Sequence, residues 1–102
     1  MVMVNRTGIR FISSTDGSID LTAASPFKAN LFVGIRMTET RSADVFLTDI
    51  TALKVATIFT GSLSRGQHSL QYNAFDLPAG VYILSLQIDG QKKISIPVVH
   101  LL

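Results

Sequence analysis

Hydrophobic and polar residues alternate along most of this chain. In the stretch NLFVGIRM at positions 30–37 the alternation is clear, and the same period of two recurs in five later segments. The residues that this period places together are Leu31, Val33, Ile35 and Met37; Val45 and Leu47; Leu53, Val55, Thr57 and Phe59; His68, Leu70 and Tyr72; Tyr82, Leu84, Leu86 and Ile88; and Ile94, Ile96 and Val98. Such a period, in segments rich in β-branched side chains, predicts half-buried strands.

Glycine-containing turns separate the alternating segments. Asp16-Gly17 stands between GIRFISS and SIDLTA, Asp89-Gly90 separates the last two segments, and GSLSRG at 61–66 marks a further turn. Asp-Gly is a strong hairpin signal because both residues tolerate a positive φ. No helical stripe interrupts the pattern. The sequence therefore predicts an all-β, immunoglobulin-like antiparallel β-sandwich of about seven strands, and residues 1–23 are expected to form an N-terminal extension or an extra hairpin.

The last alternating segment is predicted to be an edge strand. It contains Pro97, which has no amide proton to give to a neighbouring strand and is tolerated mainly at sheet edges. Lys92 and Lys93 follow the turn that opens this segment. Edge strands offer unpaired backbone groups to a partner, and nearby lysines discourage promiscuous pairing. A partner could therefore recognise this edge and its charge together.

The stretch LPAGVY at 77–82 has the form of a tyrosine corner. Leu77 is expected to enter the core, Pro78 and Gly80 to turn the chain, and Tyr82 to begin a late strand. In immunoglobulin-type sandwiches such a tyrosine often donates its hydroxyl to the backbone a few residues upstream, and buried tyrosines generally pair their hydroxyls. We therefore interpret this stretch as structural rather than as the rim of a binding or catalytic site.

Composition narrows the classes of function. The chain has 102 residues, of which 47% are hydrophobic and 16% charged, whereas an average soluble domain has about 25% charged residues. This excess of apolar residues suggests a surface that meets a partner. The net charge is only +2, with lysines and arginines scattered along the chain, so nucleic-acid binding is not expected. The longest charge-free stretch, between Asp76 and Asp89, is too short to span a bilayer.

No catalytic or metal-binding pattern is visible. The chain has no cysteine, which excludes thiol catalysis and cysteine-ligated zinc. His68 lies in a predicted strand and His100 in the tail, and neither has a carboxylate at motif spacing. The seven acidic residues form no calcium-loop pattern, no G-x-S-x-G elbow is present, and 61–66 lacks the lysine of a P-loop. We expect no enzyme activity, no cofactor and no metal.

From SPFKANLFVGIRM to its end, the chain resembles a known family. It is similar to the C-terminal sorting domain of type IX secretion cargo in Bacteroidetes-type bacteria, and to the related immunoglobulin-like domain of the flagellar hook-cap protein. The shared features are a proline turn before a strand, an aspartate turn, a Gly-x-His segment, a Leu-x-x-Gly-x-Tyr element and a Lys-Lys pair. The residues that carry them are Pro26, Asp49, Gly66, His68, Leu77, Gly80, Tyr82, Lys92 and Lys93. The resemblance covers residues 24–102 as one sorting-type domain.

The chain departs from this family at three places. The first proline of the family's Pro-Asn-Pro turn is missing, and the chain ends in the apolar IPVVHLL where the family usually ends near a basic residue. Ala52 follows Asp49 where the family usually has glycine. A glycine adopts the left-handed conformation at little cost, so Ala52 must either bear strain or use another turn.

The resemblance implies a non-enzymatic domain that directs a cargo across the outer membrane by type IX secretion. Its partners would be the secretion machinery or neighbouring protein domains, with no nucleic acid and no transmembrane segment, and its location the cell surface or the medium. One alternative is a structural or assembly immunoglobulin-like module of a cell-surface or flagellar-type protein. Another is a carbohydrate-binding module, which usually needs exposed planar aromatics, but the chain has no tryptophan and only Tyr72 and Tyr82 as tyrosines.

Overall fold

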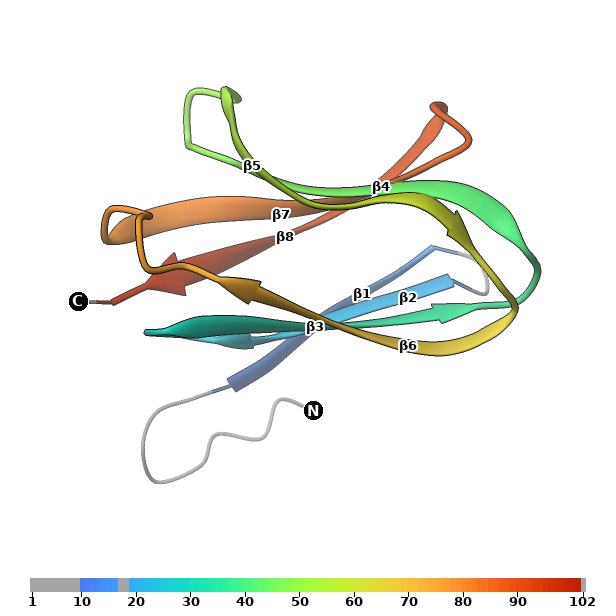
Figure 1. The fold of residues 1–102 in the computed structure, drawn as a ribbon, viewed down its shortest axis with the longest axis horizontal. Coiled ribbons are helices and arrows are strands. Elements are labelled where there is room, and N and C mark those ends of the chain that lie inside the picture. The colour runs from blue at the N-terminus through green and yellow to red at the C-terminus, as the bar shows by residue number, and fades with distance from the viewer. Residues whose placement is uncertain (1–9, 17–18, 102) are drawn as a thin grey trace.

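The computed structural model describes residues 10–16 and 19–101, which form β-strands and no helix. The strands are β1 (Arg10–Asp16), β2 (Ile19–Ser25), β3 (Asn30–Met37), β4 (Arg41–Thr48), β5 (Lys54–Leu63), β6 (Gly66–Asn73), β7 (Gly80–Ile88) and β8 (Lys92–His100). They make two four-stranded antiparallel sheets, in the orders β1-β2-β3-β6 and β5-β4-β7-β8. Figure 1 shows the sheets as two facing layers. The prediction of an all-β antiparallel sandwich is confirmed.

The seven strands from β2 to β8 form the sandwich itself, and β1 extends one sheet by pairing with β2. Arg10 lies opposite Ser25 and Asp16 opposite Ile19, so only residues 17 and 18 link the two strands. These two residues, and with them half of the predicted Asp16-Gly17 turn, lie outside the described residues. The position between residues 23 and 24, where the sorting-type resemblance begins, falls inside β2.

The core lies between the two sheets and is filled by the predicted inward faces of five strands. Buried and exposed side chains alternate along each strand because successive side chains point to opposite faces of the sheet. The buried residues that the alternation placed inward are Leu31, Val33, Ile35, Met37, Val45, Leu47, Tyr82, Leu84, Leu86, Ile88, Ile94, Ile96 and Val98. Leu70 and Tyr72 of β6 are half-buried and pack against this core. The turn at Asp89 and Gly90 is also as predicted, with φ values of 52° and 70°.

The predicted inward face of the LKVATIF segment was wrong for Leu53, Val55 and Thr57, which are exposed. Ala56 and Ile58 pack against the core instead. The pairing of β4 with β5 contains two register shifts, and a β-bulge changes which side chains of a strand face inward. The edge strand β5 therefore does not keep one period along its length, which simple alternation assumes.

The GSLSRG stretch crosses from one sheet to the other. Gly61 pairs with Ala43 inside β5, and only Ser64 and Arg65 separate β5 from β6. Since β5 and β6 belong to different sheets, the connection joins the two layers and is not a hairpin. No helix in residues 10–16 and 19–101 has the length and apolar character needed to cross a membrane.

Candidate functional site

The tyrosine corner is present and is structural. The hydroxyl of buried Tyr82 donates to the carbonyl oxygen of Pro78 at 2.5 Å. Gly80 has a positive φ of 156°, which side-chain-bearing residues rarely adopt. Leu77 packs against the core, and its amide donates to the carbonyl oxygen of Ala74 at 3.0 Å. These contacts confirm the corner and explain why the sequence needs tyrosine and glycine there.

His100 is the residue whose role sequence reasoning missed. It is the last residue of β8, is buried, and stacks on Phe27 with 4.9 Å between the ring centroids. Its Nε2 lies 2.8 Å from the carbonyl oxygen of Lys28, and its Nδ1 lies 3.2 Å from that of Pro78. The imidazole thus joins three segments of the chain. No local sequence signal could reveal this, because Lys28 is 72 positions away.

The segment Ser25–Phe27 covers part of the outer edge of β8. Ser25 Oγ accepts from the amide of Val99 at 2.9 Å, the amide of Phe27 donates to the carbonyl oxygen of Val99 at 2.9 Å, and Leu101 donates to Phe27 at 2.8 Å. β8 is an edge strand, as Pro97 predicts. Backbone groups alternate in direction along a strand, so the outward groups of the first half of β8, around Lys93 and Ser95, pair with no other described strand, while β1 packs close to β8.

The two adjacent lysines of β8 lie at the turn end of this uncovered half. The Nζ atom of Lys93 is 5.8 Å from the centroid of the Phe46 ring, and that of Lys54 is 4.4 Å from it. Phe46 is buried although it belongs to the outer face of its sheet. The lysine side chains therefore cover this ring and place positive charge above it, a favourable cation–π arrangement.

Asp49 organises the loop between β4 and β5. Its Oδ1 accepts from the amide of Thr51 at 2.8 Å, from the hydroxyl of Thr51 at 2.6 Å and from the amide of Leu53 at 3.1 Å. The hydroxyl bond from Thr51, with the two amides, lowers the pKa of Asp49. Ala52 has a φ of 71°, so it bears the left-handed conformation for which the family uses glycine. Asp49 is a turn residue.

The remaining motif residues do not gather into one site. Gly66 opens β6 with a φ of 123°, and His68 Nε2 lies 2.6 Å from the carbonyl oxygen of Ser64 in the crossing between the sheets. Gly66 pairs with Met37, the last residue of β3, whereas the segment before β3 contacts His100, the last residue of β8. Gly66 and His68 therefore lie at the end of the sandwich where Lys92 and Lys93 begin β8. The corner residues, Pro26 and Asp49 lie at the opposite end. In the described residues no group of histidine and carboxylate side chains could hold a metal ion.

The two ends of the sandwich differ in surface chemistry. We call the end that carries loops 26–29, 49–53 and 74–79 and Leu101 the apolar end; it lies to the left in Figure 1. Among the described residues, all the exposed large hydrophobic side chains belong to this end. They lie in its loops, at Leu101, or within three residues of the strand termini that these loops join. These residues are Phe32, Ile50, Leu53, Val55, Phe75, Val81, Val99 and Leu101. The opposite, charged end carries Glu39, Arg41, Arg65, Asp89 and Lys92.

A hollow of about 280 Å³ opens at the apolar end. It lies where the amide of Ala74 donates to the carbonyl oxygen of Ala29 at 2.9 Å and joins two of the loops. The residues that line it are Lys28, Ala29, Ala74, Phe75, Leu77, His100 and Leu101. Phe75 forms one wall, yet its side chain is 86% exposed. An apolar hollow beside a protruding aromatic ring is a feature of protein-interaction surfaces.

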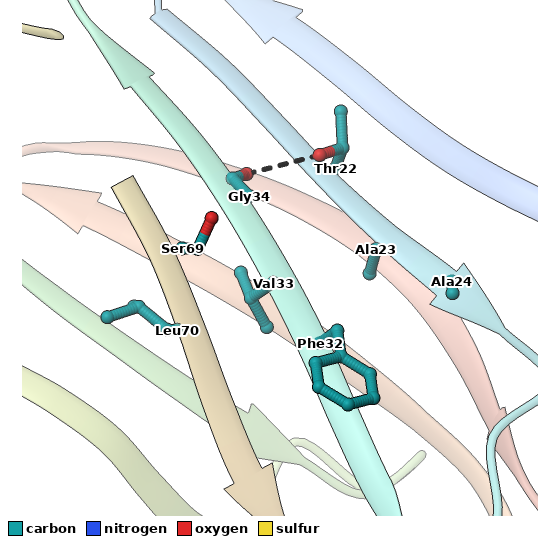
Figure 2. Close-up of a pocket in the computed structure, with 8 residues that line it drawn as sticks. All are labelled: Thr22, Ala23, Ala24, Phe32, Val33, Gly34, Ser69 and Leu70. Carbon is teal, nitrogen blue, oxygen red and sulfur yellow. Dashed lines mark hydrogen bonds between the residues drawn. The ribbon is translucent and has the colours of Figure 1, made fainter. Parts of the chain in front are cut away.

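A second, smaller hollow lies on the outer face of the β1-β2-β3-β6 sheet, over Gly34 (Figure 2). A Cβ atom at Gly34 would come within 2.6 Å of Thr22 Oγ1, so a side chain at this position would clash with Thr22. Thr22 and Ser69 flank it, and Phe32 lies at one end with 56% of its surface exposed. Phe32 is an exposed planar aromatic that a count of tryptophan and tyrosine overlooks.

Comparison with known proteins does not assign this chain to a family. No family model matches the chain, and neither the curated proteins nor the solved structures include a match. The function therefore has to be argued from the two-sheet fold, the edge of β8 and the apolar end.

Proposed function

We propose that this domain is a non-enzymatic recognition module that sorts an attached cargo across the outer membrane by type IX secretion. The observation that carries the proposal is the β7–β8 hairpin. It ends in an edge strand whose first half pairs with no other described strand, and its turn is followed by Lys92 and Lys93. A receptor strand could add to this open half while acidic receptor groups meet the lysines. On this proposal the protein works in the medium or at the cell surface.

The histidines support a non-enzymatic role. His68 and His100 both turn ring nitrogens toward backbone carbonyl oxygens, at Ser64, Lys28 and Pro78. A catalytic imidazole instead faces a nucleophile or a substrate and is oriented by a third group. In this domain the two rings hold loops and strand ends together.

The export test uses the full 102-residue chain fused to a reporter that is directed to the periplasm of a type IX-competent bacterium. We expect the reporter at the cell surface, and we expect retention in a secretion-null host. Lys92→Glu with Lys93→Glu should trap part of the reporter in the periplasm. The matched control, Lys28→Glu with Arg65→Glu, changes the same total charge, leaves the first half of β8 unaltered and should leave export unchanged.

Removal of residues 94–102 is a poorer test because Ile94, Ile96 and Val98 are core residues. Ser95→Pro is a sharper variant: it removes an outward amide at the first half of β8 and leaves the core face intact. Ser95→Ala is its control, because it loses the same hydroxyl contact with buried Ser85 and keeps the amide. Its folding is checked by its thermal melting midpoint. If the intact fusion stays in the periplasm while the host exports its own cargo, the sorting proposal fails.

The second candidate function is an assembly module that packs against neighbouring domains in a larger surface protein. The apolar end favours it, because exposed apolar side chains concentrated in one region usually mark an interaction site. Substitution of Ile50 and Leu53 by serine separates the two proposals. Loss of assembly with export unchanged supports the assembly module, whereas loss of export with both lysines intact contradicts the β8-based sorting route.

A further inference from the structure

We infer that two copies of this chain associate through their apolar ends, with Phe75 of each copy seated in the hollow of the other. This inference does not depend on export, and it concerns a surface that the sorting proposal does not use. It rests on a protruding ring, a hollow beside it that accepts such a ring, and an opposite pair of charges at the rim.

The backbone that carries the protruding ring is fixed by hydrogen bonds of its own loop. The amide of Phe75 donates to Asn73 Oδ1 at 2.9 Å, and the neighbouring amides of Ala74 and Leu77 donate to Ala29 and Ala74 at 2.9 and 3.0 Å. Because these bonds fix the backbone on both sides of Phe75, little backbone freedom remains to be lost on association. A pre-positioned, solvent-exposed aromatic ring is the usual form of an anchor residue.

The hollow is large enough and has the right lining. Its volume is about 280 Å³, whereas a cavity of about 150 Å³ binds benzene. The methyl groups of Ala29 and Ala74 and the side chains of Leu77 and Leu101 supply an apolar lining. A phenyl ring that enters it would leave water for an apolar surface, which favours association.

The positions of ring and hollow suit a two-fold symmetric pair. Phe75 is a wall of its own hollow, so the element that inserts and the element that receives are neighbours on one surface. A two-fold axis between two such surfaces makes both insertions at once and closes the assembly at a dimer. The two Phe75 rings would pass beside each other, where offset or edge-to-face contact between aromatic rings is favourable.

Charge at the rim supports the same arrangement. Asp76 follows Phe75 in the protruding loop, and Lys28 lines the hollow. Both residues are exposed. When Phe75 enters the hollow of the other copy, Asp76 is carried toward Lys28 of that copy, and symmetry gives the contact twice. The charges of the three loops and of the adjoining start of β5 sum to zero: Lys28 and Lys54 are positive, and Asp49 and Asp76 are negative. The apolar end therefore offers no net attraction to an anionic membrane.

Sedimentation velocity of the full chain from about 1 to 500 µM tests the inference. We expect a concentration-dependent monomer–dimer equilibrium, and Phe75→Ser should weaken the dimer about 30-fold or more, the effect of losing an anchor residue. Phe32→Ser is the matched control, because it removes an exposed phenylalanine of β3 that lines the second hollow and not the hollow beside Phe75, and it should leave the equilibrium unchanged. Thermal melting confirms that each variant is folded.

Charge exchange tests the orientation of the pair. Asp76→Lys should weaken the dimer, since it places like charges at both rims, and Lys28→Asp in the same chain should restore it. Phe75→Trp gives a second readout: the chain has no other tryptophan, and its emission should shift to the blue as the dimer forms.

Three results would overturn the inference. One is a wild-type chain that remains monomeric at every concentration. The second is a dimer that is lost with Phe32→Ser but not with Phe75→Ser, and the third is a double charge exchange that restores nothing. Flotation with neutral phosphatidylcholine vesicles would instead assign the apolar end to a membrane surface.

Discussion

The two ends of the sandwich close the same fold by different means. At the charged end Arg41 pairs with Glu39 and Asp89, and Asp89 also accepts from the amide of Ser42 at 3.2 Å. These bonds are exposed, so water can replace each of them. At the apolar end the closing groups are the buried rings of Tyr82 and His100, while apolar side chains of the loops face solvent. The end that is held closed by buried rings is thus also the end with exposed apolar side chains. For this reason we propose that the two copies associate through the apolar end.

The largest effect should follow from His100→Ala. It removes a buried ring that stacks on Phe27 and contacts two carbonyl oxygens, and we expect a loss of about 2–4 kcal/mol of stability in urea unfolding. His68→Ala, at the half-buried histidine toward the charged end, should cost clearly less. Equal costs for the two variants would break the contrast between the ends.

Next come the variants of the tyrosine corner. Tyr82→Phe keeps the ring and loses one hydroxyl bond, which should cost about 0.5–1.5 kcal/mol. Gly80→Val should cost more, about 1–3 kcal/mol, because a β-branched residue resists the positive φ, although no atom lies within 4 Å of the new Cβ. If both variants unfold at the wild-type urea midpoint, the corner does not hold the apolar end closed.

Among the described residues, each end has one non-glycine residue with a positive φ, and replacing the two should have opposite results. Ala52→Gly should raise stability by about 1 kcal/mol, because it removes left-handed strain from alanine. Asp89→Gly should bring no gain, since aspartate tolerates this conformation and its bonds to Ser42 and Arg41 are lost. Melting midpoints that rise by the same amount in both variants would contradict this difference.

The smallest effect concerns pH. The hydroxyl of Thr51 is the main cause of the lowered pKa of Asp49, so Thr51→Val should raise that pKa toward its ordinary value, as an NMR titration of the carboxyl group measures. Because the folded-state pKa lies below 3.8, the stabilising contribution of Asp49 is present above pH 3.8 and is lost as the pH falls through the folded-state pKa. An unchanged titration in Thr51→Val would show that the two amides alone set the pKa.

Local signals in the sequence were sufficient for much of the fold. Alternation located the inward faces of β3, β7 and β8, and Asp89-Gly90 and LPAGVY identified a hairpin and a corner, because each depends on residues close in sequence. The face of β5 was wrong because bulges opposite β4 are not encoded in a period of two. The sheet crossing at Ser64 and Arg65 also depends on pairing with distant strands.

The candidate surfaces were less predictable than the strands. The edge position of β8 followed from Pro97, but its partial covering depends on Ser25 Oγ, 74 positions from Val99. The hollow beside Phe75 forms between loops that are distant in the chain, and the exposure of Phe32 depends on neighbours in the sheet. Each of these features depends on contacts between residues that are distant in the sequence, and a local sequence pattern does not reveal such contacts.

The contacts of the Ser25–Phe27 segment with Val99, His100 and Leu101 also affect the timing of folding during synthesis. An incomplete chain that lacks the last nine residues has no partner for Ser25 Oγ and no ring to stack on Phe27. It also lacks the core residues Ile94, Ile96 and Val98. The domain can therefore complete its structure only after Leu101 has left the ribosome exit tunnel. A partner that recognises the finished β8 or the hollow at the apolar end would then meet only domains in which β8 is in place.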